Sequence, residues 1–436
     1  MGTLLSDVWT RTVARAPAAA AVIDGVTGRT WSRGELARAA GEWGATGAAT
    51  ELGGRRVVLV EPNGPGWWIA FLGLCAAGAV PAPLDATEPP ERRSALARAV
   101  GAGWIWEHGR LERVGPGRRA RDRAAALIKI TSGSTGAPRA LVFTAAQMLA
   151  DGAQVAATMK ITGADRNLAT IPLGHSYGLG NLVLPLVAQG TALVCAPSPL
   201  PHAIAAECRR WRPTVWPAVP AVLDALTRSA IEPEALASLR LVISAGAPLR
   251  AGVAAAFAAR FGRRIHGFYG ASETGGICFD RDGAATLEGR SVGAPLEGVA
   301  VEFGRGGRFA VRSAAALRGR FRPADRGRWN EHGELVLLGR AGRMIKIAAR
   351  RVDLGEVERA LREIPGVRDT WACAHPDRPD AIAAAVVAGA GAGEMPAAQI
   401  RAGLATRLAA WKVPARIVVL TEFPLTARGK LDTARL

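Results

Sequence analysis

Hydrophobic and polar positions alternate along the first 250 or so residues in a way that predicts parallel strands joined by helices. Short, β-rich apolar runs are separated by segments with helical periodicity, the arrangement typical of βαβ units. The runs are RRVVLVEP (55–62), ALIKITSG (126–133), NLATIPL (167–173), TALVCAP (191–197) and LRLVISAG (239–246). Two helix starts carry capping-box residues, Ser32 with Glu35 and Thr144 with Gln147, which satisfy free backbone N–H groups.

The pattern changes twice in the second half of the chain. Between residues 275 and 321 the helical period disappears, and glycine-rich pieces predict a small antiparallel or barrel-like β subdomain. Strand-like and helical segments then mix, as in a compact α+β unit, at 344–348, 353–364, 367–374, 381–389 and 397–408. We therefore expect an α/β protein with a large N-terminal domain (1–339) and a small mobile C-terminal α+β domain (340–436).

The charge balance does not favour a nucleic-acid partner. The net charge of +18 comes from 55 Lys and Arg against 37 Asp and Glu, but the arginines are scattered. The one dense run, residues 118–123, contains no aromatic residue that would stack on bases. An arginine-rich surface that attracts anionic ligands such as nucleotides is the simpler interpretation.

Two further features predict a cytoplasmic protein without a membrane span. The five cysteines have spacings that suit neither a zinc site nor a disulfide framework, which indicates a reducing compartment. The longest apolar stretch, residues 67–80, is interrupted by glycine and stopped by Pro81, and it is too short to cross a bilayer.

The pentapeptide GHSYG (174–178) matches GxSxG, the turn that carries the nucleophilic serine of many hydrolases. That reading also needs an acid and a late histidine, and the histidines after Ser176 carry no supporting signature. Short patterns with two glycines are expected by chance in a chain that has 52 of them. A structural turn is therefore favoured, and a serine hydrolase remains the minor alternative.

A strand that runs into TSGSTGAPRA (131–140) has the chemistry of a phosphate-binding loop. Glycines let the backbone fold around an anion, and the hydroxyls add hydrogen-bond donors. It is not a Walker A loop. Two more segments fit a nucleotide: ISAGAPL (243–249) offers backbone to a flat base, and GFYGASETGG (267–276) combines an aromatic ring with a lone carboxylate of the kind that Mg²⁺ prefers.

With these segments in this order, the sequence resembles the adenylate-forming superfamily of acyl-CoA synthetases, luciferase and peptide-synthetase adenylation domains. The likeness covers nearly the whole chain. Besides the three segments above, IPLGHSYGLG (171–180) resembles the acyl-side motif of the family. PADRG (323–327), LGRAGRMIKI (338–347) and PLTARGKLD (424–432) resemble its ribose, hinge and C-terminal lysine motifs.

The resemblance implies a role for each matching residue. Lys430 would bridge the carboxylate and the α-phosphate, Ser272 would hold the α-phosphate, Glu273 would ligate Mg²⁺, and His175 would border the acyl group. The residues implied in ATP binding are Thr131, Ser132, Gly133, Ser134, Thr135, Gly136, Arg139, Gly246, Ala247, Tyr269, Gly270, Asp325 and Arg340.

The implied activity is ATP-dependent conversion of a carboxylic acid to an acyl-adenylate with release of pyrophosphate, followed by transfer to a thiol of CoA or of the phosphopantetheine of an acyl carrier protein. The acyl-side motif has no acidic residue to bind an α-amine, so an aryl or fatty acid is expected. Arg139 stands where the family usually has a lysine in the phosphate loop. This replacement keeps the positive charge but changes the geometry of its hydrogen-bond donors.

Three departures near the hinge concern the second half-reaction. Gly342 replaces an acidic hinge residue, and Ala348 and Ala349 replace a glycine pair that lines the thiol route in the family. A relative that binds a nucleotide or acyl group without turnover is a second hypothesis, against which the presence of Glu273, Asp325 and Lys430 argues.

Overall fold

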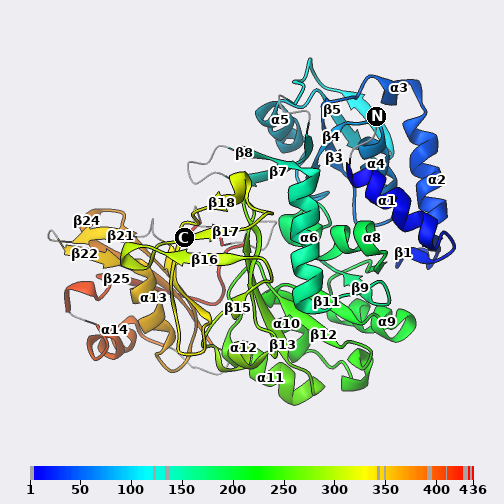
Figure 1. The fold of residues 1–436 in the computed structure, drawn as a ribbon. Helices are drawn as coiled ribbons and strands as arrows, with labels where there is room; N and C mark the ends of the chain where they lie inside the picture. Colours follow the sequence, from blue (N-terminus) through cyan, green and yellow to red (C-terminus); the bar gives the residue numbers. More distant parts are fainter. Residues whose placement is uncertain are drawn as a thin grey trace. The chain divides into compact units, whose positions relative to one another are not determined.

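The chain folds into two compact units. The computed structural model describes residues 4–120, 124–132, 138–340, 344–347, 350–389, 395–408, 410–425, 431–432 and 435–436. The first unit comprises Met1–Glu302, Ala310–Phe321 and Trp329–Val336, and the second comprises Phe303–Phe309, Arg322–Arg328 and Leu337–Leu436 (Figure 1). The second unit therefore takes two short segments from the middle of the chain as well as its C-terminal part.

A nine-stranded sheet forms the centre of the first unit, in the order β15-β14-β13-β12-β11-β9-β10-β1-β2. The strands from β1 to β13 in this order pair in parallel, and β2, β14 and β15 add antiparallel edges. Their bounds are β1 Ala20–Asp24, β2 Thr30–Ser32, β9 Arg166–Ala169, β10 Ala192–Cys195, β11 Val215–Ala218, β12 Leu241–Ser244, β13 Ile265–Ala271, β14 Gly275–Phe279 and β15 Ala294–Pro295.

Helices cover both faces of this sheet, and the strand residues alternate between two cores. Val22 and Leu193 join one core, whereas the adjacent Ile23 and Val194 join the other, as the two-residue period of a strand requires. The helices are α1 Leu4–Arg15, α2 Arg33–Gly44, α3 Gly47–Thr50, α4 Pro65–Ala76, α5 Pro90–Val100, α6 Ala145–Met159, α7 Ser176–Gly178, α8 Leu184–Gln189, α9 Pro201–Trp211, α10 Pro220–Arg228, α11 Ala251–Phe261 and α12 Ala284–Glu288.

Local sequence signals place several of these helices correctly. Both predicted capping boxes are confirmed: Glu35 and Gln147 each occupy the third helical position and bond reciprocally with Ser32 and Thr144. Helix α4 is apolar on all sides because it is buried. Across the residues with described placement, no helix is long and apolar enough to cross a membrane.

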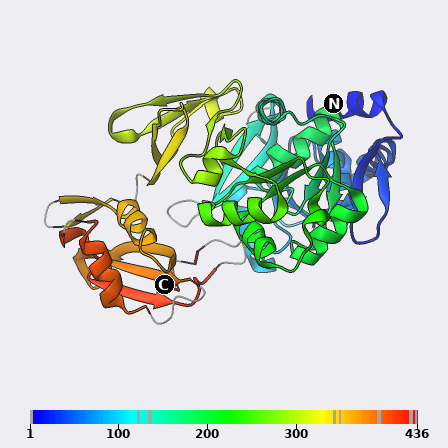
Figure 2. The same ribbon diagram turned by 90° about the horizontal axis from the view of Figure 1, so that it is seen from below.

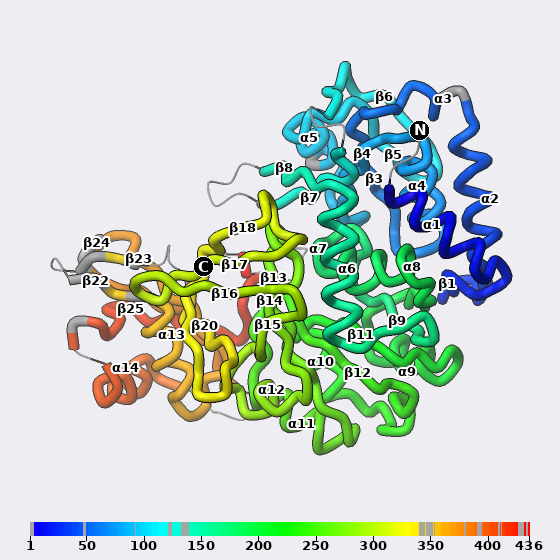
Figure 3. Tube along the Cα trace, viewed as in Figure 1, coloured from blue at the N-terminus to red at the C-terminus, as the bar shows by residue number. Residues whose placement is uncertain are grey.

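A second sheet and a hairpin complete the N-terminal half. The sheet has the order β4-β3-β5-β6, with β3 Arg56–Val60, β4 Val80–Leu84, β5 Trp104–Glu107 and β6 Arg110–Arg113. The hairpin consists of β7 Ala125–Ser132 and β8 Pro138–Thr144, drawn side by side in Figure 3. The expectation that the run 126–133 is a strand of a parallel βαβ unit was wrong, because this strand pairs antiparallel with β8.

Short strands follow β15, and among them β17 and β18 pair antiparallel. One sheet has the order β16-β17-β18, with β16 Ala300–Phe303, β17 Phe309–Arg312 and β18 Arg320–Phe321, and a two-stranded sheet joins β19 Asp325–Trp329 to β20 Leu335–Arg340. Helix α12 also interrupts the region 275–321, where no helical period was expected.

The C-terminal part has its own core. It contains β21 Met344–Ile347, β22 Arg350–Asp353, α13 Leu354–Arg362, β23 Val367–His375, β24 Arg378–Ala388, α14 Ala397–Ala405 and β25 Arg416–Leu420. Val357, Val386 and Ile400 are buried together in this core. Figure 2 shows α13 and α14 beside the sheet β23-β24-β25. The predicted fold class, with a large parallel-sheet domain and a separate small α+β domain, is confirmed.

All five cysteines lie in the described part of the chain; four of them are buried, and none forms a disulfide bond. The buried residues are Cys75, Cys195, Cys208 and Cys278, whereas Cys373 on β23 is partly exposed. Removal from water raises the pKa of the Cys195 and Cys208 thiols to about 12, because burial disfavours the thiolate.

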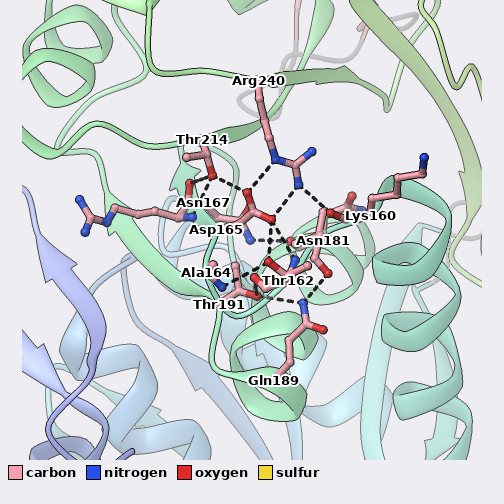
Figure 4. A network of polar contacts seen from close by, with 12 residues as sticks. Lys160, Thr162, Ala164, Asp165, Asn167, Asn181, Gln189, Thr191, Thr214 and Arg240 are labelled. Atoms are coloured by element: carbon pink, nitrogen blue, oxygen red, sulfur yellow. Dashed lines mark hydrogen bonds and ion pairs between the residues drawn. The ribbon is translucent and has the colours of Figure 1, made fainter.

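The buried carboxylate of Asp165, directly before β9, forms hydrogen bonds with three surrounding residues. Asp165 accepts hydrogen bonds from Arg240 Nε at 2.8 Å and Nη2 at 2.7 Å, from the Thr214 hydroxyl at 2.7 Å and from the Thr162 backbone N–H at 2.9 Å (Figure 4). Its side chain is 8% exposed. Although burial alone opposes the effect, the hydrogen bonds from Arg240, Thr162 and Thr214 lower the pKa of Asp165 to about 2.

The Asp165→Asn variant is expected to unfold at a lower temperature than the wild type at pH 7. The variant has a neutral amide in place of the carboxylate, so it loses the charge-assisted hydrogen bonds from Arg240, each worth about 2 kcal/mol. Because folding lowers this pKa, the stabilisation is complete above about pH 4 and is lost as pH falls toward 2. Thermal unfolding between pH 7 and pH 3 tests this, and a difference between the two proteins that grows on acidification contradicts it.

Candidate active site

The predicted nucleotide and acyl segments meet at the carboxyl ends of the parallel strands of the nine-stranded sheet. Residues 243–249, the adenine segment, continue from β12. Residues 272–276, the magnesium segment, start in the turn between β13 and β14 and extend into β14. The segment 171–180 follows β9. This edge is where open α/β sheets bind ligands, and all three segments belong to the first unit.

The predicted adenine segment presents accessible backbone. Gly246 and Ala247 are exposed directly after β12. Gly246 has a φ of +88°, in the left-handed region that favours glycine. Tyr269 on β13 is half-buried and Gly270 is exposed. An exposed peptide next to a partly buried ring fits a flat base, so these residues are compatible with the predicted adenine site.

The magnesium segment begins where β13 ends. Ser272 and Glu273 are half-buried, and the backbone carbonyl of Glu273 accepts a hydrogen bond of 2.9 Å from the N–H of Leu317. Among the described residues there is no cluster of three or more His, Cys, Asp or Glu that would hold a metal. A single carboxylate does fit Mg²⁺, which binds one or two carboxylates together with substrate phosphates.

A direct hydrogen bond links the acyl segment to the magnesium segment. The Ser176 hydroxyl donates to the Ser272 hydroxyl at 3.0 Å, although the two residues are 96 positions apart. Ser176 begins α7. The partner of its hydroxyl is a second serine and not a histidine, so the geometry does not present Ser176 as the activated nucleophile of a triad.

Hydrogen bonds and ring packing fix the positions of the residues that follow Ser176. Tyr177 is half-buried, its hydroxyl donates to the Ile243 carbonyl at 3.3 Å, and its ring lies 5.8 Å from that of Phe268. Burial raises the pKa of Tyr177. One π-helical turn follows at Leu179–Val183, and the Asn167 amide donates to the Asn181 carbonyl there at 3.1 Å. π-Helical turns are frequent at functional sites.

His175 has an acidic neighbour that the sequence did not reveal. Its Nε2 lies 3.4 Å from Asp85 Oδ2, and the other oxygen of Asp85 accepts hydrogen bonds from the Thr87 backbone N–H and hydroxyl at 2.9 and 2.8 Å. The acyl segment itself lacks a carboxylate, but the end of β4 brings one to it. A polar residue directly after a buried strand was the available signal.

The phosphate loop is only partly described. Thr131 is half-buried and pairs across the hairpin with the exposed Arg139. The side chain of Ser132 and all of Gly133, Ser134, Thr135 and Gly136 lie outside the described residues. The loop therefore connects two antiparallel strands, and its phosphate contacts remain a prediction.

The predicted ribose, hinge and lysine residues belong to the second unit. Asp325 is half-buried at the start of β19, and Arg340 ends β20 with its side chain outside the described part. The predicted positions 342, 348 and 349, and Lys430, also lie outside the described residues. The roles of these residues remain predictions.

Two family models match the chain. The model of the AMP-binding enzyme matches residues 9–114 and 106–303, and the model of the AMP-binding enzyme C-terminal domain matches residues 356–430. The first match contains the phosphate, acyl, adenine and magnesium segments. The second contains the predicted lysine.

Curated relatives resemble the chain over most of its length. A feruloyl-CoA synthase from Amycolatopsis sp is 28% identical over 87% of each chain. An L-proline--[L-prolyl-carrier protein] ligase from Streptomyces coelicolor is 31% identical over 76% of this chain and 69% of that protein. Other relatives are larger: the chain spans 43% of the anguibactin system regulator from Vibrio anguillarum, less than half of that protein's length.

Solved structures agree in fold. ATP-bound MatB from Rhodopseudomonas palustris has a TM-score of 0.85 at 20% identity, over 100% of this chain and 98% of that one. The O-succinylbenzoate coenzyme A synthetase MenE from Bacillus subtilis, in complex with AMP, has a TM-score of 0.83 at 21% identity, over 98% and 97%. The chain therefore belongs to the AMP-binding enzyme family, the adenylate-forming superfamily that its motifs predicted.

Proposed function

We propose that this protein activates a carboxylic acid with ATP, forming an acyl-adenylate and releasing pyrophosphate. The observation that carries the proposal is the 3.0 Å hydrogen bond between Ser176 and Ser272. It brings the acyl segment into contact with the nucleotide segment at the ligand-binding edge of the sheet. An enzyme that joins an acid to the α-phosphorus of ATP needs these two subsites to touch.

The chemistry explains the residue types. The carboxylate oxygen attacks the α-phosphorus of ATP, the bond from the α-phosphorus to the α,β-bridging oxygen breaks, and pyrophosphate departs with the electron pair. Negative charge grows around the α-phosphorus, and Lys430, placed there in advance, would stabilise it. Ser272 would donate its hydroxyl hydrogen to the same phosphate. Mg²⁺, held by Glu273, would neutralise phosphate charge when bound.

The proposed substrate is an aryl or fatty acid without an α-amino group. The acyl segment 171–180 contains no acidic residue, and Asp85, a carboxylate next to it, already contacts His175 and Thr87. Among the relatives, one is a feruloyl-CoA synthase and another a prolyl-carrier-protein ligase. We propose a thiol acceptor of the same two kinds, CoA or the phosphopantetheine of a carrier protein.

The test supplies ATP, Mg²⁺ and a panel of aryl, fatty and amino acids with hydroxylamine, and measures hydroxamate and pyrophosphate. Acid-dependent formation of both products supports the proposal. Silence across the panel, with ATP still bound, contradicts it in favour of a binding protein. Ester cleavage without ATP contradicts it in favour of a hydrolase.

Replacing Ser176 by alanine distinguishes an adenylate-forming enzyme from a serine hydrolase. Loss of one neutral hydrogen bond, about 1 kcal/mol, is expected to lower the rate of adenylation by less than roughly tenfold. A catalytic nucleophile would instead be indispensable. Hydroxamate formation by the variant is the measurement, and ester cleavage by the wild type that disappears in the variant contradicts the expectation.

A further inference from the structure

Two charged side chains are buried behind the magnesium segment, and no role was predicted for either. Lys129 on β7 is 4% exposed and Asp151 on α6 is 3% exposed. Lys and Asp are almost never fully buried unless they are paired. Lys129 lies in the strand that leads into the phosphate loop, and its Nζ lies 4.4 Å from the centre of the Phe143 ring.

Asp151 contacts the turn that follows Glu273. Its Oδ1 accepts a hydrogen bond of 3.0 Å from the N–H of Gly276. A Cβ atom on Gly275 would lie 2.1 Å from the same oxygen, so the turn approaches the carboxylate more closely than any other residue type allows. Gly275 also has a φ of +73°. Asp151 therefore explains the glycine at position 275, whereas a Cβ atom on Gly276 would meet the side chains of Leu296 and Phe268.

The same carboxylate also reaches the acyl segment. A Cβ atom on Gly180 would lie 3.1 Å from Asp151 Oδ2, so the π-helical turn packs closely against it. Helix α6, the acyl segment and the magnesium segment thus converge at the buried carboxylate of Asp151, and the buried Lys129 on β7 contributes a charge that acts on it. All four belong to the first unit.

The charge of Lys129 and the charge of Asp151 each affect the pKa of the other residue. Burial lowers the pKa of Lys129, and the charges of Asp151 and Glu273 oppose this effect. Burial raises the pKa of Asp151, and Lys129 and the Gly276 N–H oppose it. Burying two charged groups adds little net stability. The position of the Asp151 carboxylate is therefore better explained by its contacts with the turn at Gly275 and Gly276.

We propose that Asp151 is a positioning residue for Glu273: it fixes the turn at Gly275 and Gly276 and so aims the Glu273 carboxylate, while Lys129 supplies the balancing charge. The proposal rests on the proposed function, since it assigns Mg²⁺ binding to Glu273. It is not a catalytic role, because Asp151 contacts the segment that carries the ligand and not the reacting atoms.

The test compares Asp151→Asn and Asp151→Leu with a matched control, Asp165→Asn, which removes another buried, paired carboxylate from the same unit. Asparagine can still accept the Gly276 hydrogen bond through its amide oxygen, but leucine cannot. Supporting residues around a metal site typically change metal affinity by about 10–100-fold. We expect the Mg²⁺ concentration for half-maximal pyrophosphate release to rise by about that factor in Asp151→Leu and by less in Asp151→Asn.

A second readout does not depend on turnover. The shift in melting temperature given by ATP with Mg²⁺ is compared with that given by ATP with EDTA. Asp151→Leu is expected to lose the difference between the two, and Asp165→Asn to keep it despite a lower melting temperature. If Asp151→Leu does not fold, Asp151→Asn and Lys129→Met are measured in the same way.

The outcomes distinguish the two ideas. Selective loss of the Mg²⁺ response in the Asp151 variants supports the inference. Equal Mg²⁺ responses in the Asp151 and Asp165 variants overturn it and leave the proposed function intact. A wild-type protein that neither releases pyrophosphate nor responds to Mg²⁺ with ATP overturns both.

Discussion

Replacing Lys430 by alanine is expected to lower the rate of acyl-adenylate formation by about 100- to 1,000-fold, the usual cost of removing one preorganised group from a developing charge. The affinity for ATP should change little, because the lysine is proposed to act on charge that grows during the reaction. An interaction that is stronger in the transition state than in the ground state affects the rate and not ground-state binding.

Initial rates of pyrophosphate release, together with equilibrium binding of ATP, measure this directly. Lys412→Ala is the matched control: it removes a lysine from the same unit, one whose ammonium lies 2.6 Å from Glu356. The control is expected to keep most of its activity. Equal rates for Lys430→Ala and wild type, with the same acid, contradict the proposed role.

Replacing Glu273 by glutamine is expected to lower the adenylation rate by about 100-fold at low Mg²⁺ concentration, because a neutral amide is a poorer ligand than a carboxylate for a hard divalent cation. Raising the Mg²⁺ concentration should restore part of the rate. Melting temperature without ligands should change little, since the side chain is only half-buried.

Titration of the rate with Mg²⁺ at saturating ATP is the measurement for Glu273→Gln. Glu297→Gln, at an exposed position of the same unit, controls for the loss of one negative charge from the protein. A rate that is low at every Mg²⁺ concentration assigns Glu273 another function, and an unchanged titration removes it from the metal site.

Local features of this fold were predictable from the sequence because they depend on residues close together in the chain. The capping boxes at Ser32 and Thr144 need only a partner three positions away. The order of strands and helices follows from the periodicity of apolar residues in the same way. Motif order was enough to identify the family, since each motif keeps its chemistry at its own position.

Pairings between distant segments were not predictable from the same signals. The apolar pattern of 126–133 identifies a strand, but it does not say that 138–144 folds back on it as an antiparallel partner. Likewise nothing in GHSYG indicates that Ser176 donates to Ser272. Such contacts depend on tertiary packing, which overrides local preference.

The burial of Lys129 and Asp151 is partly visible in the sequence. A lysine in the middle of the apolar run ALIKI is unusual, because burying an ammonium requires a compensating charge. Asp151 lies on the buried face of α6. Neither residue type is diagnostic alone, and only the fold shows that the two charges share one interior.

The cysteines are distributed between the two units, so their reactivity can report local unfolding of each unit. The first unit buries four cysteines, so a thiol reagent can reach their sulfur atoms only when that unit opens. The partly exposed Cys373 belongs to the second unit. The order in which the five sulfur atoms become alkylated would therefore report which part of the chain loosens first, without any engineered probe.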